Sequence, residues 1–165
     1  MVVLYAIYFS QRTVSVHNGL GTSAFDFGLY DQGIWLLSRG HSPFVTLMGR
    51  NLFGDHSSFI LLLLVPLYWI FSTTSLLFIV QSIVVACGAL PVYWFARQRL
   101  RSEPQAAVMA AVYLLHPSIG WTNLENFHPD AALGTFVALA IWAAYAGKWR
   151  WYWVAVVLAL SVKED

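Results

Sequence analysis

Two carboxylates, Asp26 and Asp31, stand in a polar stretch, Gly21 to Gln32, of an otherwise apolar sequence. A carboxylate at the edge of an apolar phase can take a proton from a hydroxyl group or orient a substrate. The two side chains lie about 140° apart on any regular helix, so they point to different faces. Asp26 is therefore the candidate catalytic base and Asp31 a supporting carboxylate in the catalytic set. The alternative for Asp26 is a first-turn residue that stabilises a helix N-terminus.

A second group of residues could bind an anion. Asp55 and His56 precede the apolar run 59–71, and Lys163 and Glu164 follow the last apolar run. An imidazole next to a helix N-terminus attracts phosphate, and a lysine offers it a point charge. The alternatives are an N-cap for Asp55, an exposed first-turn residue for His56, and a solvated helix end for the Lys163 segment.

Three residue types that can ligate metals occur together in the segment NLENFHPD, namely Glu125, His128 and Asp130. Their spacing permits a divalent metal without requiring one, so we expect these residues to line either an acceptor site or a metal site. A proline at position 129, directly after a histidine, is also typical of an ordinary helix start. The sequence contains no phosphate-binding glycine loop, nucleophile elbow or zinc motif.

The composition indicates a membrane protein. Hydrophobic residues make up 59% of the chain and charged residues only 10%, whereas soluble domains average about 25% charged residues. The net charge of +1 says nothing about nucleic acid, but no basic cluster is interleaved with aromatic residues in a soluble context, so no nucleic-acid partner is expected. The single cysteine, Cys87, excludes an intrachain disulfide. We therefore expect an all-α, polytopic transmembrane bundle with membrane lipid as a partner.

The apolar runs and the basic turns predict an orientation. The run 59–71 is about 20 Å long and contains Pro66, so we expect an interfacial helix rather than a span across a core of about 30 Å. Basic residues in short loops stay cytoplasmic, which places the turns Arg97–Arg101 and Lys148–Arg150 inside and the segment 11–57 outside. The predicted spans are a truncated first span at 1–10, then 75–97, 104–121, 131–146 and 149–162.

The outer segment 11–57 is long for a connection, and loops of this length are usually functional. Within it, 23–37 predicts a short helix that is capped by Ser23. Its apolar face is expected to contain Phe25, Leu29, Ile34, Trp35 and Leu36. The chain as a whole, 1–165, is interpreted as the N-terminal part of a single, longer transmembrane domain.

Several segments together resemble a known family. In chain order they are FDFGLYDQGIW, GDHSSFILLLLVPLYWIF, LPVYWFARQRL, NFHPDAAL and VKED. They resemble a domain family of unknown function, made of bacterial and archaeal predicted membrane proteins, that is grouped with the GT-C glycosyltransferase superfamily. The resemblance covers nearly all of the chain.

The resemblance implies a GT-C-like fold and activity. Members of this superfamily transfer a sugar from a polyprenyl-phosphate carrier at the outer or lumenal membrane face, and their first outer loop carries an acidic residue. By position, Asp26 matches that residue, and His56 and Lys163 match groups that bind the phosphate. This chain departs from the adjacent or nearly adjacent acidic pairs of many relatives, because four residues separate Asp26 from Asp31.

The resulting hypothesis is a glycosyltransferase of the cytoplasmic membrane that uses a polyprenyl-phosphate-linked sugar. A non-enzymatic membrane protein is the first alternative, either a transporter or a lipid-binding subunit. Transporters place charges near the bilayer midplane on broken helices, whereas the predicted charges here gather at one membrane edge. An inactive GT-C-like scaffold is the second alternative.

Overall fold

The longest helix of the chain forms the axis of the fold. In the computed structural model, which describes residues 1–163, α4 (Ser75–Cys87) continues through Gly88 into α5 (Ala89–Leu100). Within the described residues, this 26-residue helix is the one that is long and apolar enough to cross a membrane. The predicted span at 75–97 corresponds to this helix, which extends to Leu100.

Gly88 permits close packing in the middle of this axis. A Cβ atom at Gly88 would collide with the hydroxyl groups of Tyr113 and Thr135, which approach from two neighbouring helices. The Tyr113 hydroxyl donates to the Val85 carbonyl (3.1 Å), and the Thr135 hydroxyl donates to the Val84 carbonyl (2.9 Å). The glycine thus brings three helices to within hydrogen-bonding distance at one level.

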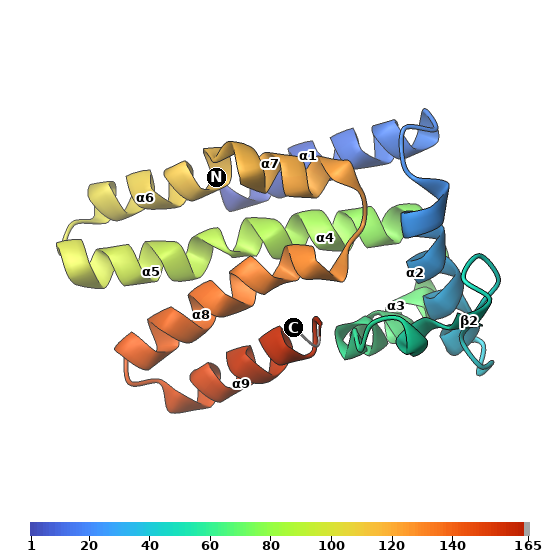
Figure 1. Ribbon diagram of the computed structural model, residues 1–165. Coiled ribbons are helices and arrows are strands. Elements are labelled where there is room, and N and C mark those ends of the chain that lie inside the picture. Colours follow the sequence, from blue (N-terminus) through green and yellow to red (C-terminus); the bar gives the residue numbers. More distant parts are fainter. Residues whose placement is uncertain (164–165) are drawn as a thin grey trace.

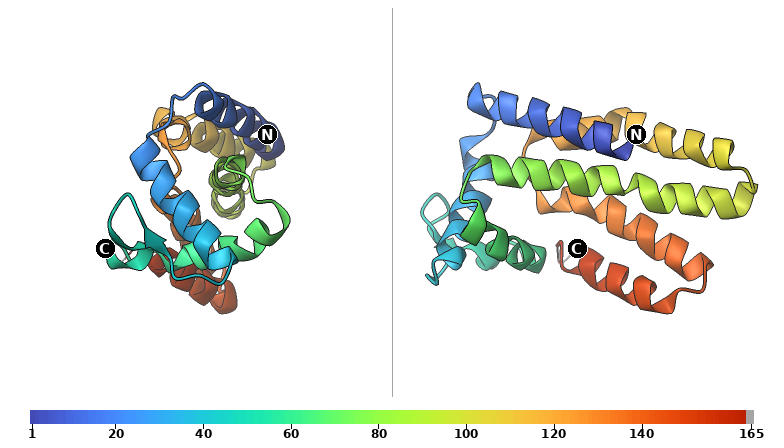
Figure 2. Two further views of the ribbon diagram at one scale, coloured as in Figure 1. Left: turned by 90° about the vertical axis from the view of Figure 1, so that its right-hand side faces the viewer. Right: turned by 180° about the vertical axis from the view of Figure 1, so that it is seen from behind.

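The other bundle helices run alongside this axis (Figures 1 and 2). In chain order they are α1 (Val2–Asn18), α6 (Glu103–Leu115), α7 (Pro117–Glu125), the 3₁₀ helix η3 (Pro129–Ala132), α8 (Leu133–Tyr145) and α9 (Trp149–Leu160). α1 packs on α4, α6 and α8 pack on α5, and α9 packs on α8. The structure is thus all-helical apart from one two-stranded hairpin, which agrees with the predicted all-α class.

The first helix extends well beyond its predicted end at residue 10. α1 continues to Asn18 and stops at Gly19. The polar residues after position 10 do not interrupt the helix, because Gln11, Arg12 and Ser15 are exposed and Thr13 has a partner within the helix. Thr13 is buried and donates its hydroxyl to the Phe9 carbonyl (2.8 Å). The connection that was predicted to begin at residue 11 therefore begins after α1, eight residues later.

The predicted span 104–121 consists of two helices. α6 ends at Leu115, and His116 adopts an extended conformation before Pro117 begins α7. A proline disfavours the helical conformation of the residue before it, which explains the break. The predicted span 131–146 corresponds to η3 and α8, and 149–162 corresponds to α9.

A second group of elements covers one end of the bundle. These are α2 (Ala24–Ser38), the hairpin β1 (Phe44–Val45) and β2 (Arg50–Asn51), the 3₁₀ helices η1 (Leu52–Gly54) and η2 (Phe59–Leu64), and α3 (Val65–Ile70). The end-on view in Figure 2 shows α2 crossing the end of the bundle. The basic turns after α5 and α8 lie at the opposite end (Figure 1).

The segment predicted as one interfacial helix, 59–71, consists of two consecutive helices of different type. It begins as η2 and becomes α3 at Val65, with Pro66 in the first turn of α3. Proline is favoured at this position because the first-turn N–H groups have no intrahelical partner. The Ile60 N–H donates to the Ser161 carbonyl (2.8 Å), which joins η2 to the end of α9.

The helix predicted at 23–37 is present as α2, but its buried face differs from the prediction. Phe25 and Trp35 are 53% and 43% exposed, whereas Ile34 is fully buried. α2 buries Phe27, Leu29 and Ile34 in a core cluster that includes Val45 and Leu52 of the hairpin region, Tyr68 of α3 and Phe78 of α4. The elements of this end cover α2 on more than one side, so a single stripe could not identify the buried face.

Candidate functional site

Asp26 lies in the first turn of α2, and that turn is held from two sides. The Ser23 hydroxyl accepts a hydrogen bond from the Asp26 N–H (3.3 Å), which confirms the predicted cap. The Ser23 N–H itself donates to the Asn126 side-chain oxygen (3.0 Å), more than a hundred residues later in the chain. The position of Asp26 therefore depends on the segment that follows α7.

That segment is fixed by one buried glutamine of α4. The Gln81 amide nitrogen donates to the Asn126 carbonyl (2.8 Å), with longer contacts to the carbonyls of Thr122 and Asn123 (both 3.4 Å). Its amide oxygen accepts from the His128 N–H (2.9 Å). A single side chain of the axial helix thus satisfies backbone groups on both sides of Phe127, and it sets the positions of Asn126 and His128.

Tyr30 lies at the centre of the candidate residues. Its ring packs edge to face against Phe127 (centroids 5.6 Å apart) and against His128 (6.1 Å). Burial first, and then the negative charges of Asp130, Asp55 and Asp26, together raise the pKa of Tyr30 to about 12. Carboxylates from three separate segments therefore lie near enough to this phenol to disfavour its ionised form.

Basic side chains accompany these carboxylates. Lys163 Nζ lies 3.8 Å from Asp130 Oδ2, with the lysine side chain 29% exposed. Arg50 Nη2 lies 3.2 Å from Asp55 Oδ1, and His56 Nε2 lies 3.8 Å from Asp55 Oδ2. The site thus combines proton acceptors with cations, and a negatively charged group could enter among them. We name Asp26, Tyr30, Asp55, His56, His128, Asp130 and Lys163 the tyrosine-centred site.

Asp31 does not belong to this site. Its carboxylate accepts a hydrogen bond from the buried hydroxyl of Tyr68 in α3 (2.7 Å). The pKa of Tyr68 is raised above its ordinary value, first by burial and then by the charge of Asp31. α2 is continuous through Gly28, so the two aspartates face different partners, and Asp31 joins α2 to α3.

Glu125 is also separate from the other candidates. It is exposed at the end of α7, two residues before the buried Phe127. In the described part of the chain, no group of three or more His, Cys, Asp or Glu side chains is placed to hold a metal ion. The Glu125, His128 and Asp130 set therefore does not converge on a metal site. Glu164 lies outside the described residues.

An apolar cavity of about 190 Å³ adjoins the site. It lies between η2, α4 and η3, and its wall includes Gln81, Phe127 and His128. Its other lining residues are hydrophobic side chains and Pro129. One wall of this cavity is therefore shared with the tyrosine-centred site, and its chemistry suits a hydrocarbon chain rather than a polar ligand.

The sequence reasoning missed Tyr30, Tyr68, Gln81 and Asn126. Gln81 carried a usable signal, because a polar side chain in the middle of an apolar span is costly and needs partners. Asn126 is part of a polar segment between two helices, but nothing in the sequence connects it to Ser23. Tyr30 and Tyr68 are aromatic residues in a chain that contains 16% aromatics, so their types alone did not distinguish them.

Comparison with known proteins identifies a family for this chain. A family model described as "Predicted membrane protein (DUF2079)" matches residues 16–165. No curated protein and no solved structure matches the chain. The matched region contains every residue of the tyrosine-centred site.

Proposed function

Because the chain belongs to the DUF2079 family of predicted membrane proteins, we propose that it is a membrane glycosyltransferase of GT-C type. Its donor would be a sugar linked to polyprenyl phosphate, and transfer would take place at the outer face of the cytoplasmic membrane. The observation that carries the proposal is the tyrosine-centred site itself. Carboxylates, imidazoles and a lysine from distant segments meet there, next to an apolar cavity.

The proposed reaction assigns a role to each side chain. Asp26 accepts the proton of the acceptor hydroxyl as that oxygen attacks the anomeric carbon of the sugar. The bond between this carbon and the phosphate oxygen breaks with inversion, and its electron pair leaves with the polyprenyl phosphate. His56 and Lys163 stabilise the charge on that phosphate. Asp55 orients His56, to which it lies close (3.8 Å).

The remaining candidates have supporting roles. His128 and Asp130 line the acceptor side of Tyr30, and Glu125 would meet the acceptor at the edge of the site. Asp31 positions α2 through Tyr68. Glu164 is proposed to act next to Lys163 on the phosphate. The apolar cavity beside His128 would hold the first part of the polyprenyl chain.

The proposed orientation is a polytopic bundle with the tyrosine-centred site outside. Bundle helices besides the axial one expose large apolar side chains, for example Leu4 of α1 (72%), Val108 of α6 (60%) and Val157 of α9 (63%). Exposed apolar faces of this extent suit contact with lipid. Both basic turns lie at the end opposite to α2 (Figure 1), in agreement with a cytoplasmic location.

This orientation can be tested by cysteine labelling. In a Cys87→Ser background, an impermeant maleimide should label Ser42→Cys in intact cells and should label Arg101→Cys only after permeabilisation. The reverse pattern would contradict the proposal.

The catalytic role of Asp26 is tested with the full-length protein in membranes. Asp26→Asn should lower sugar transfer from the lipid-linked donor by about a hundredfold or more, because general-base catalysis contributes about 10²–10⁴-fold. Glu103→Gln, which removes a carboxylate at the opposite end of the bundle, is the matched control and should retain activity. Equal activity of Asp26→Asn and the unmodified protein would contradict the assignment.

A lipid-binding subunit without transferase activity is the second candidate. The observation that favours it is the apolar lining of the cavity between η2 and α4. This candidate predicts that the full-length protein binds polyprenyl phosphate, that it transfers no sugar, and that Asp26→Asn leaves the binding unchanged. The transfer assay therefore distinguishes the two functions.

A further inference from the structure

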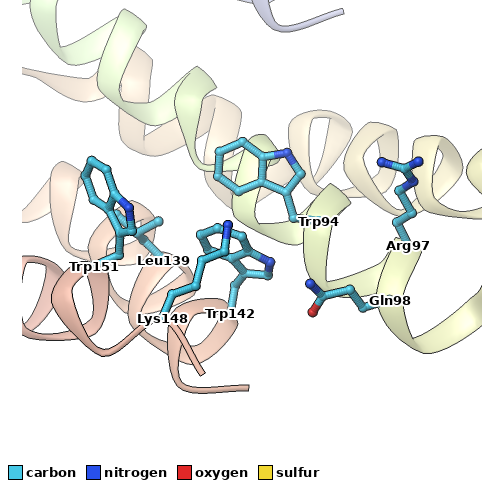
Figure 3. Close-up of a pocket in the computed structure, with 7 residues that line it drawn as sticks. All are labelled: Trp94, Arg97, Gln98, Leu139, Trp142, Lys148 and Trp151. Carbon is cyan, nitrogen blue, oxygen red and sulfur yellow. The ribbon is translucent and has the colours of Figure 1, made fainter. Parts of the chain in front are cut away.

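The end of the bundle opposite to the tyrosine-centred site contains a second cavity of about 670 Å³ (Figure 3). It lies between α5, α8 and the start of α9. Its lining consists of Trp94, Arg97, Gln98, Leu139, Trp142, Lys148 and Trp151. We name it the tryptophan–lysine cavity. Nothing in the proposed transfer reaction uses these residues.

The lining of this cavity contains both cations and aromatic rings. Lys148 Nζ lies over the ring of Trp142, 4.7 Å from its centroid, and the rings of Trp94 and Trp142 are 4.6 Å apart. Figure 3 shows the Lys148 amine over the Trp142 ring, with the Trp94 ring beside it. Tryptophan is enriched at the level of the lipid headgroups, where its ring is partly buried and its N–H stays within reach of polar groups.

One polar group in the cavity wall lacks a partner. Trp142 is 8% exposed, and no hydrogen-bond acceptor lies within reach of its indole N–H in the described residues. In Figure 3 this nitrogen faces Gln98 across the cavity. An unpaired buried N–H is costly, so the arrangement suits a ligand that brings an acceptor to this position.

The excess of positive charge around the cavity favours a negatively charged ligand. The adjoining segments 97–103 and 148–150 contain five basic residues and one acidic residue, Glu103. Glu103 pairs with Arg97 (2.7 Å), and no carboxylate is among the lining residues of the cavity. A phosphate oxygen would satisfy both the Trp142 N–H and the Lys148 ammonium group, whereas the ring faces and Leu139 would accept hydrocarbon.

We propose that the tryptophan–lysine cavity binds the headgroup of an anionic phospholipid. The phosphate would accept hydrogen bonds from the Trp142 indole and from Lys148, and the glycerol and upper acyl chain would lie against the three tryptophan rings. This site follows from the placement of the chain in a membrane and does not depend on glycosyl transfer. Basic pockets between membrane helices on the cytoplasmic side commonly bind such headgroups.

Native mass spectrometry of the full-length protein tests the proposal. The solubilised protein is titrated with phosphatidylglycerol and, separately, with phosphatidylcholine. The unmodified protein should bind phosphatidylglycerol more tightly. Lys148→Gln should weaken that binding about fivefold, since one basic residue contributes about 1 kcal/mol at a membrane surface. Lys148→Arg should restore most of it.

Two further variants separate the cavity from general surface charge. Trp142→Phe keeps an aromatic ring and removes the indole N–H, so it should weaken phosphatidylglycerol binding severalfold, about the value of one hydrogen bond, and leave phosphatidylcholine binding unchanged. Arg101→Gln removes a cation of the basic turn after α5, outside the cavity, and should bind as the unmodified protein does. The comparison of Trp142→Phe with Arg101→Gln is decisive even if Lys148→Gln fails to fold.

Three outcomes would overturn the proposal. The first is equal affinity of the unmodified protein for both lipids. The second is an equal loss of affinity in Lys148→Gln and Arg101→Gln, which indicates unspecific surface charge. The third is displacement of phosphatidylglycerol by glycerol phosphate at similar concentrations, which indicates a site for a free phosphate and not for a lipid.

Discussion

The two ends of the bundle hold their charges in different ways. At the tyrosine-centred site, carboxylates and cations come from several segments, and hydrogen bonds from Gln81 and Asn126 fix the segments that carry them. At the tryptophan–lysine cavity, Lys148 lies against an aromatic ring, and the Trp142 N–H has no hydrogen-bond partner among residues 1–163. The first arrangement determines geometry, as chemistry requires. The second arrangement leaves a hydrogen-bond donor and a cation available to a ligand.

The largest expected difference between the two ends is the loss of stability when one glutamine at each end is replaced. Gln81→Leu leaves the Asn126 carbonyl and the His128 N–H without partners in a buried place, so we expect a loss of about 3 kcal/mol of stability. Gln98→Leu changes an exposed residue and should cost less than about 0.5 kcal/mol. Thermal unfolding in detergent measures both variants. Similar losses would show that the two ends do not differ in this way.

A smaller difference is expected between two tyrosine hydroxyls that bond to charged partners. Tyr68 donates to Asp31 from a buried position, and Tyr145 bonds to Arg99 at the exposed end (2.8 Å). Tyr68→Phe should cost about 2 kcal/mol, because it leaves a half-buried carboxylate without its donor. Tyr145→Phe should cost less than about 0.5 kcal/mol. Unfolding of both variants under the same conditions tests the comparison, and a larger loss in Tyr145→Phe would contradict it.

The smallest effect is a pH dependence at the tyrosine-centred site. The pKa of Tyr30 rises from 10 to about 12 on folding, so the folded state keeps the phenol proton when the unfolded state has lost it. The stabilisation is present below about pH 10 and is lost as the pH rises towards 12. Tyr30→Phe should therefore lose less stability than the unmodified protein over this range. Parallel curves would argue against the burial of Tyr30 and against the negative charges near it.

Helix types and the positions of several boundaries followed from the sequence, because they depend on local signals. The Ser23 cap, the spanning length of the helix that starts at Ser75 and the helix start at Pro129 are examples. The continuation of α1 past residue 10 did not follow, since an internal hydrogen bond satisfies the buried Thr13 and several other polar residues are exposed. The break at His116 comes from the proline after it, whereas the apolar run around it favoured one continuous span.

Tertiary contacts determine which residues belong to the tyrosine-centred site, and the spacing of residues in the sequence does not reveal these contacts. Asp26, Asp55, His56, His128, Asp130 and Lys163 were candidates from their types and places. In the structure His128 packs against Tyr30, and the charges of Asp26, Asp55 and Asp130 act on the pKa of Tyr30. His56 and Lys163 lie beside Asp55 and Asp130. The centre itself was missed because a tyrosine among many aromatics has no distinctive local signal. Helical geometry predicted different faces for Asp26 and Asp31, although both were assigned to the catalytic set. The partner of Asp31 in the structure, Tyr68, lies 37 residues away, so spacing did not reveal it.

The most direct test of the account is an experimental structure of the full-length protein with polyprenyl phosphate. We predict that the phosphate lies between His56 and Lys163, that the first part of the chain enters the apolar cavity beside His128, and that Asp26 faces the side from which an acceptor would approach. A phosphate found only at the tryptophan–lysine cavity, with the tyrosine-centred site unoccupied, would contradict the proposed function.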